Sequence, residues 1–393
     1  MWGAAALVAG TTVGAGILAL PAVTAESGFA ASAAALTGFA LFSITTGLLV
    51  AEVNLNTLCE LGASRGVSLS SMARRTLGDA GAGAVSATYL LLHFALLVAY
   101  IAKAGETLQE ATGLPLAAVD LAFVAAFGGL CFAARPSTLD SINSALVGLV
   151  VVTFLGLLGV AATDVRPELL SAANWEALPD ALPVIALAFV YQNVVPVITT
   201  SLEGNVAKIR QAVVLGSAVP WLMFLAWNAV CLGSSGGGLL GGADGAGVDP
   251  LAALRQAGNP AVAPLLDSFT FLAIATSFIG FVLGLTDFIA DALQLPTGRQ
   301  PIPYLLTLAP PLVLALSYPS VFFSALEFAG TYGVLVLFGL IPVAMAWSER
   351  YAGTTLSRIQ VVPGGKPVLA LTAAVAAGVI ARELLSSATQ LAN

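Results

Sequence analysis

Long apolar stretches with almost no charge recur along this chain, and they leave few folds open to it. A helix that crosses a bilayer needs about 20 predominantly apolar residues. Only 9% of the 393 residues are charged, against about 25% in soluble domains. We therefore predict an all-α integral membrane protein that forms one domain over residues 1–393, with eleven transmembrane helices at 3–25, 29–55, 81–108, 116–134, 142–163, 181–202, 209–233, 261–287, 303–318, 321–347 and 368–388.

Positive residues are distributed unequally between alternate loops. If the amino terminus lies inside, the outer loops hold only Arg166 and Arg255, and the inner loops hold Arg65, Arg74, Arg75, Arg135, Lys208, Arg210, Arg299, Arg350, Arg358 and Lys366. Cytoplasmic loops carry an excess of Lys and Arg. We expect a multi-pass protein of a plasma or inner membrane, or of a plastid inner envelope. Its amino terminus would lie on the cytoplasmic or stromal side and its carboxyl terminus on the opposite side.

The sequence lacks the motifs that would indicate an enzyme. It contains no HExxH, Gly-x-Ser-x-Gly or P-loop motif, and it has one histidine, which argues against metal catalysis. We therefore expect no enzymatic activity, no cofactor and no metal other than a coupling Na⁺. The chain also lacks a basic run that would favour nucleic acid, so its partners would be the lipid bilayer and small molecules.

The first apolar stretch contains an interruption at Gly14-Ala15-Gly16, with Pro21 five residues further on. Glycine weakens a helix by roughly 1 kcal/mol relative to alanine, and proline removes a backbone donor. Non-helical backbone is tolerated in a membrane only where it is buried in protein or lines a cavity. The segment predicts a discontinuous helix, although close packing of small residues against a neighbouring helix is an alternative.

The sixth apolar stretch has a matching interruption at Gln192-Asn193, followed by Pro196. A simple proline kink is the alternative. Matched interruptions in two halves of a chain indicate a transporter binding site. Because each half holds five spans, we predict an inverted repeat, with repeat one at 1–163, repeat two at 181–347 and an extra helix at 368–388.

The sequence resembles the aromatic amino acid permeases, the tyrosine- and tryptophan-specific transport proteins of bacteria. The matching segments are Gly10–Pro21, Ala99–Ile101, Ala273–Gly280, Gly284–Asp287 and Val362–Lys366. The sixth span, Phe189–Pro196, departs from the best-known bacterial members and is more similar to a plant, algal and cyanobacterial branch. The resemblance implies the LeuT-type fold of the amino acid–polyamine–organocation superfamily, with helices 1 and 6 broken. It also implies amino acid uptake driven by a cation gradient, usually of protons.

An amino acid substrate suggests roles for the interrupted segments. The backbone N–H groups of Gly14, Ala15 and Gly16 would receive the substrate carboxylate at the start of a half-helix. Thr11 and Thr12 would add hydroxyl groups. We expect the side-chain pocket to include Tyr100, Tyr191, Gln192 and Asn193, although an interfacial role for the first and interhelical hydrogen bonds for the amides are alternatives.

A coupling ion has two sets of candidate ligands. The LeuT-type fold implies a sodium site built from Gly10, Val13, Ala273, Thr276 and Ser277, unless the span 8 hydroxyls bond back to their own helix. A proton would instead need an ionisable group within the membrane, and the candidates for proton coupling or gating are Glu52, His93, Glu327 and Asp287.

The sequence thus predicts a proton-coupled symporter of aromatic amino acids, with L-tyrosine first. Sodium coupling or another neutral amino acid is the alternative within transport. A passive channel is the alternative from another class, but it would need a repeated pore motif that the sequence lacks.

Overall fold

The computed structural model describes residues 1–14, 16–61, 67–234, 251, 254–255, 260–295, 300–352 and 359–392. Ala15 and three of the inner-loop arginines, Arg65, Arg299 and Arg358, lie outside this set. Within these ranges the chain is helical and contains no strand. The first half contains α1 (Trp2–Thr12), α2 (Gly16–Thr24), α3 (Gly28–Leu61), α4 (Leu69–Thr112), α5 (Leu116–Ala133), α6 (Pro136–Ala161) and the short η1 (Ala162–Asp164) and η2 (Pro167–Ser171).

The second half begins with α7 (Leu178–Ala188), η3 (Gln192–Val194) and α8 (Val195–Ser201). The remaining helices are α9 (Val206–Ser234), α11 (Val262–Ala292), α12 (Pro301–Ser317), α13 (Phe322–Phe328), the π-helical η5 (Ala329–Leu340), α14 (Ile341–Tyr351) and α15 (Gly365–Ala392).

Nine helical segments of the described chain are long and apolar enough to cross a membrane, and the bent pair α1 and α2 would be a tenth. Segments α7 to α8 and α13 to α14 each count as one span. Helix α12 is apolar but has only 17 residues. The prediction of an all-α membrane protein is confirmed, whereas the number eleven stays a prediction.

Helix α4 is much longer than the predicted span at 81–108. It has 44 residues and begins with a cap, in which Ser68 Oγ accepts a hydrogen bond from the Ser71 N–H at 3.2 Å. Gly78 turns the chain with a φ of 75°, and Gly113 ends the helix at a φ of 70°. Both values lie in the left-handed region that glycine adopts without a steric cost. Gly78 therefore separates a short polar helix from the apolar part of α4, which agrees with the predicted span at 81–108.

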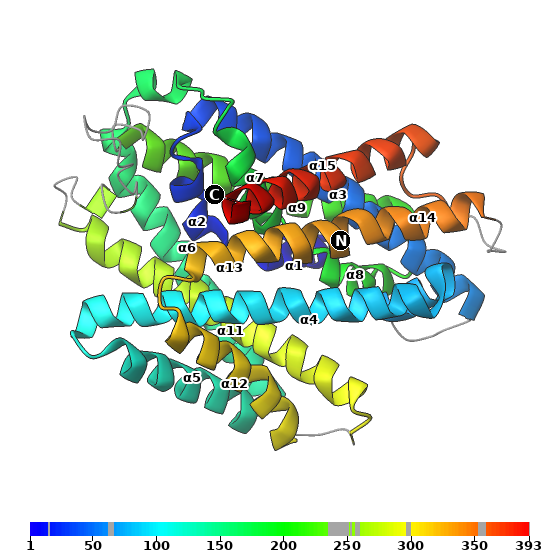
Figure 1. The fold of residues 1–393 in the computed structure, drawn as a ribbon, viewed down its shortest axis with the longest axis horizontal. Helices are drawn as coiled ribbons and strands as arrows, with labels where there is room; N and C mark the ends of the chain where they lie inside the picture. The colour runs from blue at the N-terminus through cyan, green and yellow to red at the C-terminus, as the bar shows by residue number, and fades with distance from the viewer. Residues whose placement is uncertain are drawn as a thin grey trace.

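The helices form two packing groups. Helices α1, α2, α3, α7 and α9 pack mainly on one another, and we call them the first group. Helices α4, α5, α6, α11 and α12 make up the second group, and η5 contacts both α4 and α7. In Figure 1 the long α4 crosses the molecule between α5 and α12 on one side and α13 to α15 on the other, and α11 crosses it diagonally. The candidate site lies where the two groups meet.

Candidate functional site

The first helix is broken where the glycines predict an interruption. Helix α1 ends at Thr12 and α2 begins at Gly16, and the two axes differ by 54°. Val13 is extended, with φ −77° and ψ 90°, and its N–H donates to the Ala9 carbonyl at 3.0 Å. The Ile17 N–H donates to the Gly14 carbonyl at 3.2 Å and starts the second half-helix.

The second interruption lies between α7 and α8. The N–H groups of Phe189 and Val190 close tight turns on Ala186 and Leu187, at 3.3 Å each, and the helix then stops. Residues Gln192–Val194 form one 3₁₀ turn before α8. Pro196 lies in the first turn of α8, where proline is tolerated because no intrahelical partner is lost. The proline therefore starts a new helix and does not kink an existing one.

Small residues bring the two interruptions into contact. A Cβ atom added to Gly16 would lie 3.1 Å from the Ala188 Cα. A Cβ atom on Gly14 would lie 3.0 Å from the Ser277 Oγ of α11. Both distances are tighter than an ordinary van der Waals contact. The break in the first helix is therefore held between the break in the sixth span and α11.

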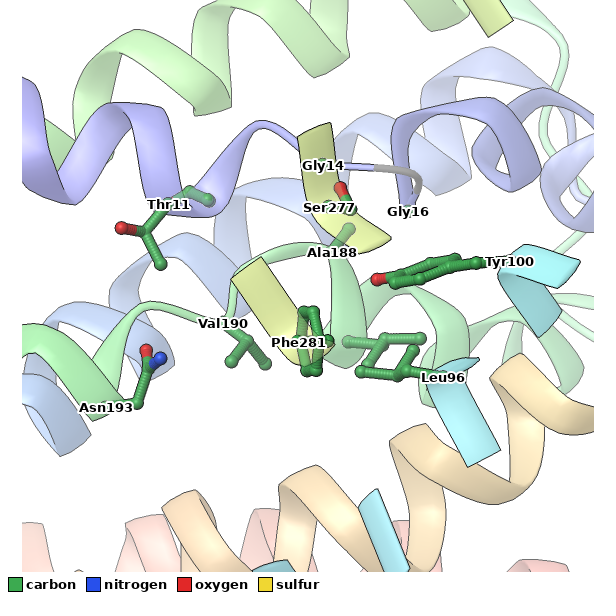
Figure 2. Close-up of a pocket in the computed structure, with 12 residues that line it drawn as sticks. Thr11, Gly14, Gly16, Leu96, Tyr100, Ala188, Val190, Asn193, Ser277 and Phe281 are labelled. Carbon is green, nitrogen blue, oxygen red and sulfur yellow. The ribbon is translucent and has the colours of Figure 1, made fainter. Parts of the chain in front are cut away.

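A cavity of about 70 Å³ lies at this point, between the two packing groups (Figure 2). The first group contributes the residues near both breaks, and α4 and α11 contribute the opposite wall. Of the predicted site residues, Thr11, Thr12, Gly14, Gly16, Tyr100, Asn193 and Ser277 line it. The full lining is Thr11, Thr12, Gly14, Gly16, Leu96, Tyr100, Leu187, Ala188, Val190, Asn193, Ser277 and Phe281.

Most of the cavity wall is apolar, with polar groups at its ends. In Figure 2 the Tyr100 hydroxyl points into the cavity, and Thr11 and Asn193 lie at the opposite end. The hydroxyls of Thr11 and Thr12 donate to the carbonyls of Leu7 and Val8 at 2.8 and 2.7 Å. These two hydroxyls have therefore used their hydrogens and can act toward a ligand only as acceptors.

Tyr191 and Gln192 face α3 and do not line the cavity. The Tyr191 hydroxyl donates to the Ser43 carbonyl at 2.8 Å. The Gln192 amide donates to Ser43 Oγ at 3.2 Å and to Thr46 Oγ1 at 3.0 Å. Ser43 Oγ in turn donates to the Phe189 carbonyl at 2.7 Å. This network fastens the second break to α3.

Sequence reasoning missed Ser43, Thr46 and Gly47 of α3. A Cβ atom on Gly47 would lie 2.8 Å from Cε2 of Tyr191, so this glycine leaves room for the tyrosine ring. The available signal was a cluster of small polar residues within an apolar span, which in a membrane must find hydrogen-bond partners.

The structure gives contacts for only some of the predicted sodium ligands. Thr276 Oγ1 donates to the carbonyls of Leu272 and Ala273 at 3.1 and 3.0 Å. This bonding within its own helix is the predicted alternative to a sodium site. A Cβ atom at Gly10 would meet nothing within 4 Å. Val13 lies at the end of α1. Within the described ranges, no group of three or more His, Cys, Asp and Glu residues is placed to hold a metal. The sodium site stays a prediction.

Glu52 is committed to an ion pair. Its carboxylate accepts bonds from Nε and Nη2 of Arg350 at 2.6 and 2.7 Å, and it is 1% exposed. The backbone N–H groups of Val361 and Val362 donate to the same carboxylate at 2.7 and 3.0 Å. These four bonds tie α3 and α14 to the segment that precedes α15.

The other ionisable candidates lie in different surroundings. His93 is buried in α4, and its Nδ1 lies 2.8 Å from the Tyr89 carbonyl oxygen. Asp287 is exposed near the end of α11. Glu327 of α13 is half-buried close to Arg382 of α15, which pairs with Asp180 at 2.8 Å.

A bundle of membrane-length helices that encloses a small cavity between two helix breaks defines a multi-pass membrane transport protein. The chain belongs to the tryptophan/tyrosine permease family, whose model matches residues 1–382. This confirms the predicted family. It is a family of transporters and not of enzymes, as the sequence predicts.

Relatives cover most of the chain. It is 29% identical over 377 residues to tyrosine-specific transport system 1 of Haemophilus influenzae, covering 90% of this chain and 89% of that one. It is 30% identical over 380 residues to system 2 of the same organism, with the same coverage. It is also 25% identical over 388 residues to glutamine transporter 2 of Aliivibrio fischeri, covering 95% of this chain and 96% of the relative.

Proposed function

We propose that this protein is a proton-coupled symporter of aromatic amino acids, with L-tyrosine as the first substrate. The observation that carries the proposal is the cavity at which two broken helices, apolar walls and the Tyr100 hydroxyl meet. The relatives named for tyrosine transport support the choice of substrate.

The substrate carboxylate would bind at the start of α2. A helix amino terminus carries about half a positive charge, together with backbone N–H groups that lack intrahelical partners. Gly14 and Gly16 supply this end without side chains that would block the approach. The ammonium group would bind the carbonyl oxygens at the ends of α1 and α7, where helical pairing stops.

The aromatic side chain would occupy the part of the cavity between Leu96, Val190 and Phe281, and its ring would pack against Tyr100. Ligand pockets usually measure about 300–1,000 Å³, whereas this cavity measures about 70 Å³. Tyrosine therefore fits only after side chains have moved. Phe281 is a large side chain of the lining, and we expect it to move first.

Transport would follow from movement of the first packing group against the second. The cavity lies between the groups, so rocking one against the other exposes it to each side of the membrane in turn. We infer that α1 with α2 and α7 with α8 are corresponding broken helices of two inverted five-span repeats. On this hypothesis α15 is an eleventh span outside the repeats, and the amino terminus is cytoplasmic or stromal.

Proton coupling is favoured over sodium coupling. The resemblance to permeases that are usually proton-driven favours it. Sodium coupling through Gly10, Val13, Ala273, Thr276 and Ser277 remains the alternative.

Uptake into proteoliposomes tests this proposal. Labelled tyrosine, tryptophan, leucine and glutamine would be offered under an imposed pH gradient and, separately, a sodium gradient. We expect tyrosine to accumulate under the pH gradient alone. Accumulation under the sodium gradient alone would show that sodium, and not the proton, is the coupling ion. Uptake that is indifferent to both gradients would refute coupled transport.

Glutamine is the second candidate substrate, and two observations favour it. One relative is named a glutamine transporter, and the Asn193 amide that lines the cavity would pair with a substrate amide. Glutamine uptake without tyrosine uptake in the same experiment would select it.

A further inference from the structure

His93 is the ionisable candidate that the described contacts connect to the cavity. Its ring lies 4.9 Å from the Phe281 ring, centroid to centroid. Phe281 lines the cavity and also packs edge-on against Tyr100, at 5.6 Å. Glu52, by contrast, is held by Arg350 and two backbone N–H groups. A side chain that lines the cavity is thus in direct contact with His93.

The hydrogen bond of His93 shows which of its nitrogens is basic. Nδ1 lies 2.8 Å from the Tyr89 carbonyl oxygen, and a carbonyl can only accept. Nδ1 therefore carries the hydrogen, and Nε2 holds the free lone pair of the neutral ring. A Cβ atom on Gly284 would lie 3.7 Å from Nε2 and 3.3 Å from the Tyr89 hydroxyl oxygen. Because residue 284 is a glycine, no side chain covers Nε2 from this side.

The ring contacts of His93 are aromatic, with Tyr89 of α4 and Phe281 of α11. On α4 itself, Tyr89 stacks on His93 at 3.8 Å and also on Phe288 of α11 at 4.8 Å. On α11, Asp287 is close enough to act electrostatically on Tyr89, and Asp291 lies one turn further on. The other elements packed against α4 in this region, η5 and α12, carry Tyr332 and Tyr304 as their titratable side chains.

We propose that Nε2 of His93 binds the transported proton and that Phe281 links this proton to the substrate cavity. The inference rests on the proposed proton-coupled symport. A proton that binds Nε2 converts the neutral ring to an imidazolium, and its release regenerates the neutral ring. No other bond changes.

The coupling follows from the position of Phe281. A cation within about 6 Å of an aromatic ring attracts its face. Protonation of His93 therefore draws Phe281 toward α4 and out of a cavity that is too small for tyrosine. Substrate that displaces Phe281 toward His93 favours protonation of His93 by the same free energy by which protonation favours substrate binding, because coupling between two sites is reciprocal.

The histidine can be observed directly, because His93 is the only histidine in the chain. Protein carrying ¹⁵N-labelled histidine, purified without a polyhistidine tag and placed in nanodiscs, yields the signal of one imidazole. The signal would be followed from about pH 5 to 8 with and without saturating tyrosine. We expect tyrosine to raise the titration midpoint, by about one pH unit for a tenfold coupling. A ring that does not titrate in this range, or a midpoint that tyrosine does not raise, would overturn the proposal.

Transport by His93→Gln provides a second test. We expect this variant to lose accumulation driven by a pH gradient but to keep tyrosine exchange within a few-fold of wild type. Thr88→Val is the matched control, because Thr88 of α4 also bonds a carbonyl four residues earlier, at 2.8 Å. Phe281→Leu keeps His93 but removes the ring that contacts it, so it should reduce the accumulation of tyrosine under a pH gradient.

The outcomes separate the inference from the proposed function. If wild type responds to the pH gradient and His93→Gln does so equally, the assignment to His93 fails and symport stands. If wild type ignores the pH gradient, both fail. If His93→Gln does not insert into the membrane, the titration of the wild-type ring decides.

Discussion

Gly16 is the residue at which the two helix breaks touch, and replacing it by alanine changes that contact alone. The added Cβ would lie 3.1 Å from Cα and 3.4 Å from Cβ of Ala188. Carbon atoms prefer separations of about 3.5–4.0 Å. The start of α2 and the end of α7 must therefore move apart by roughly 0.5 Å.

This displacement has a predictable cost. Overpacking a buried contact costs about 1–3 kcal/mol, and removing a glycine from a helix recovers up to about 1 kcal/mol. We expect the free energy of unfolding to fall by about 0–3 kcal/mol. The N–H groups at the start of α2 move with the backbone, and one hydrogen bond to a charged group contributes about 1.5–3 kcal/mol. Tyrosine affinity should therefore fall by about 10- to 100-fold.

Binding of labelled tyrosine to the purified protein measures this effect, with thermal unfolding as the check on folding. Gly38→Ala is the matched control, because Gly38 lies inside α3 and a Cβ atom there meets nothing within 4 Å. We expect the control to bind like wild type, and the larger Gly16→Leu substitution to abolish binding. Wild-type affinity in Gly16→Ala would refute the placement of Gly16 in the site.

Three further substitutions test other contacts by thermal unfolding. Tyr191→Phe removes one donor from the Ser43 carbonyl, which Thr46 Oγ1 still bonds at 3.2 Å, and should lower stability by about 0.5–1.5 kcal/mol; an unchanged melting temperature would contradict the network. Glu52→Gln leaves Arg350 buried without its counter-charge and should lower the free energy of unfolding by about 3–5 kcal/mol. Adding Arg350→Gln should recover part of this loss. If the losses of the two single variants simply add in the double variant, the ion pair is not supported. Asp120→Asn should raise the melting temperature, because Asp120 is 1% exposed and neither carboxylate oxygen has a hydrogen-bond partner in the described chain; a lower melting temperature would count against this reasoning.

The helix breaks could be predicted because their causes are local. Glycines and prolines determine backbone conformation at their own positions, so Gly14, Gly16 and Pro196 mark the interruptions directly. Helix ends were harder to predict from hydropathy. The polar first turns of α4 form a short helix that Ser68 caps and that Gly78 separates from the apolar stretch. The number of spans also depends on α12, which is shorter than a typical membrane helix.

The side chains of the second break could not be oriented from sequence. Tyr191 and Gln192 were expected in the cavity, together with Asn193, but in an irregular segment the direction of each side chain follows from its partners. Those partners, Ser43 and Thr46, lie about 150 residues earlier in the chain. The partner of Glu52 is similarly remote, because Arg350 lies 298 residues further on.

The sequence alone determined that this chain is a helical membrane protein of a transporter family, with interruptions in its first and sixth spans. These features depend on the length of apolar runs and on the backbone chemistry of glycine and proline, which act locally. Only the tertiary structure decided which side chains line the cavity, that Gly16 touches Ala188, and that His93 contacts Phe281. Such contacts depend on how helices distant in sequence pack together, and a single sequence does not encode that packing in any local pattern.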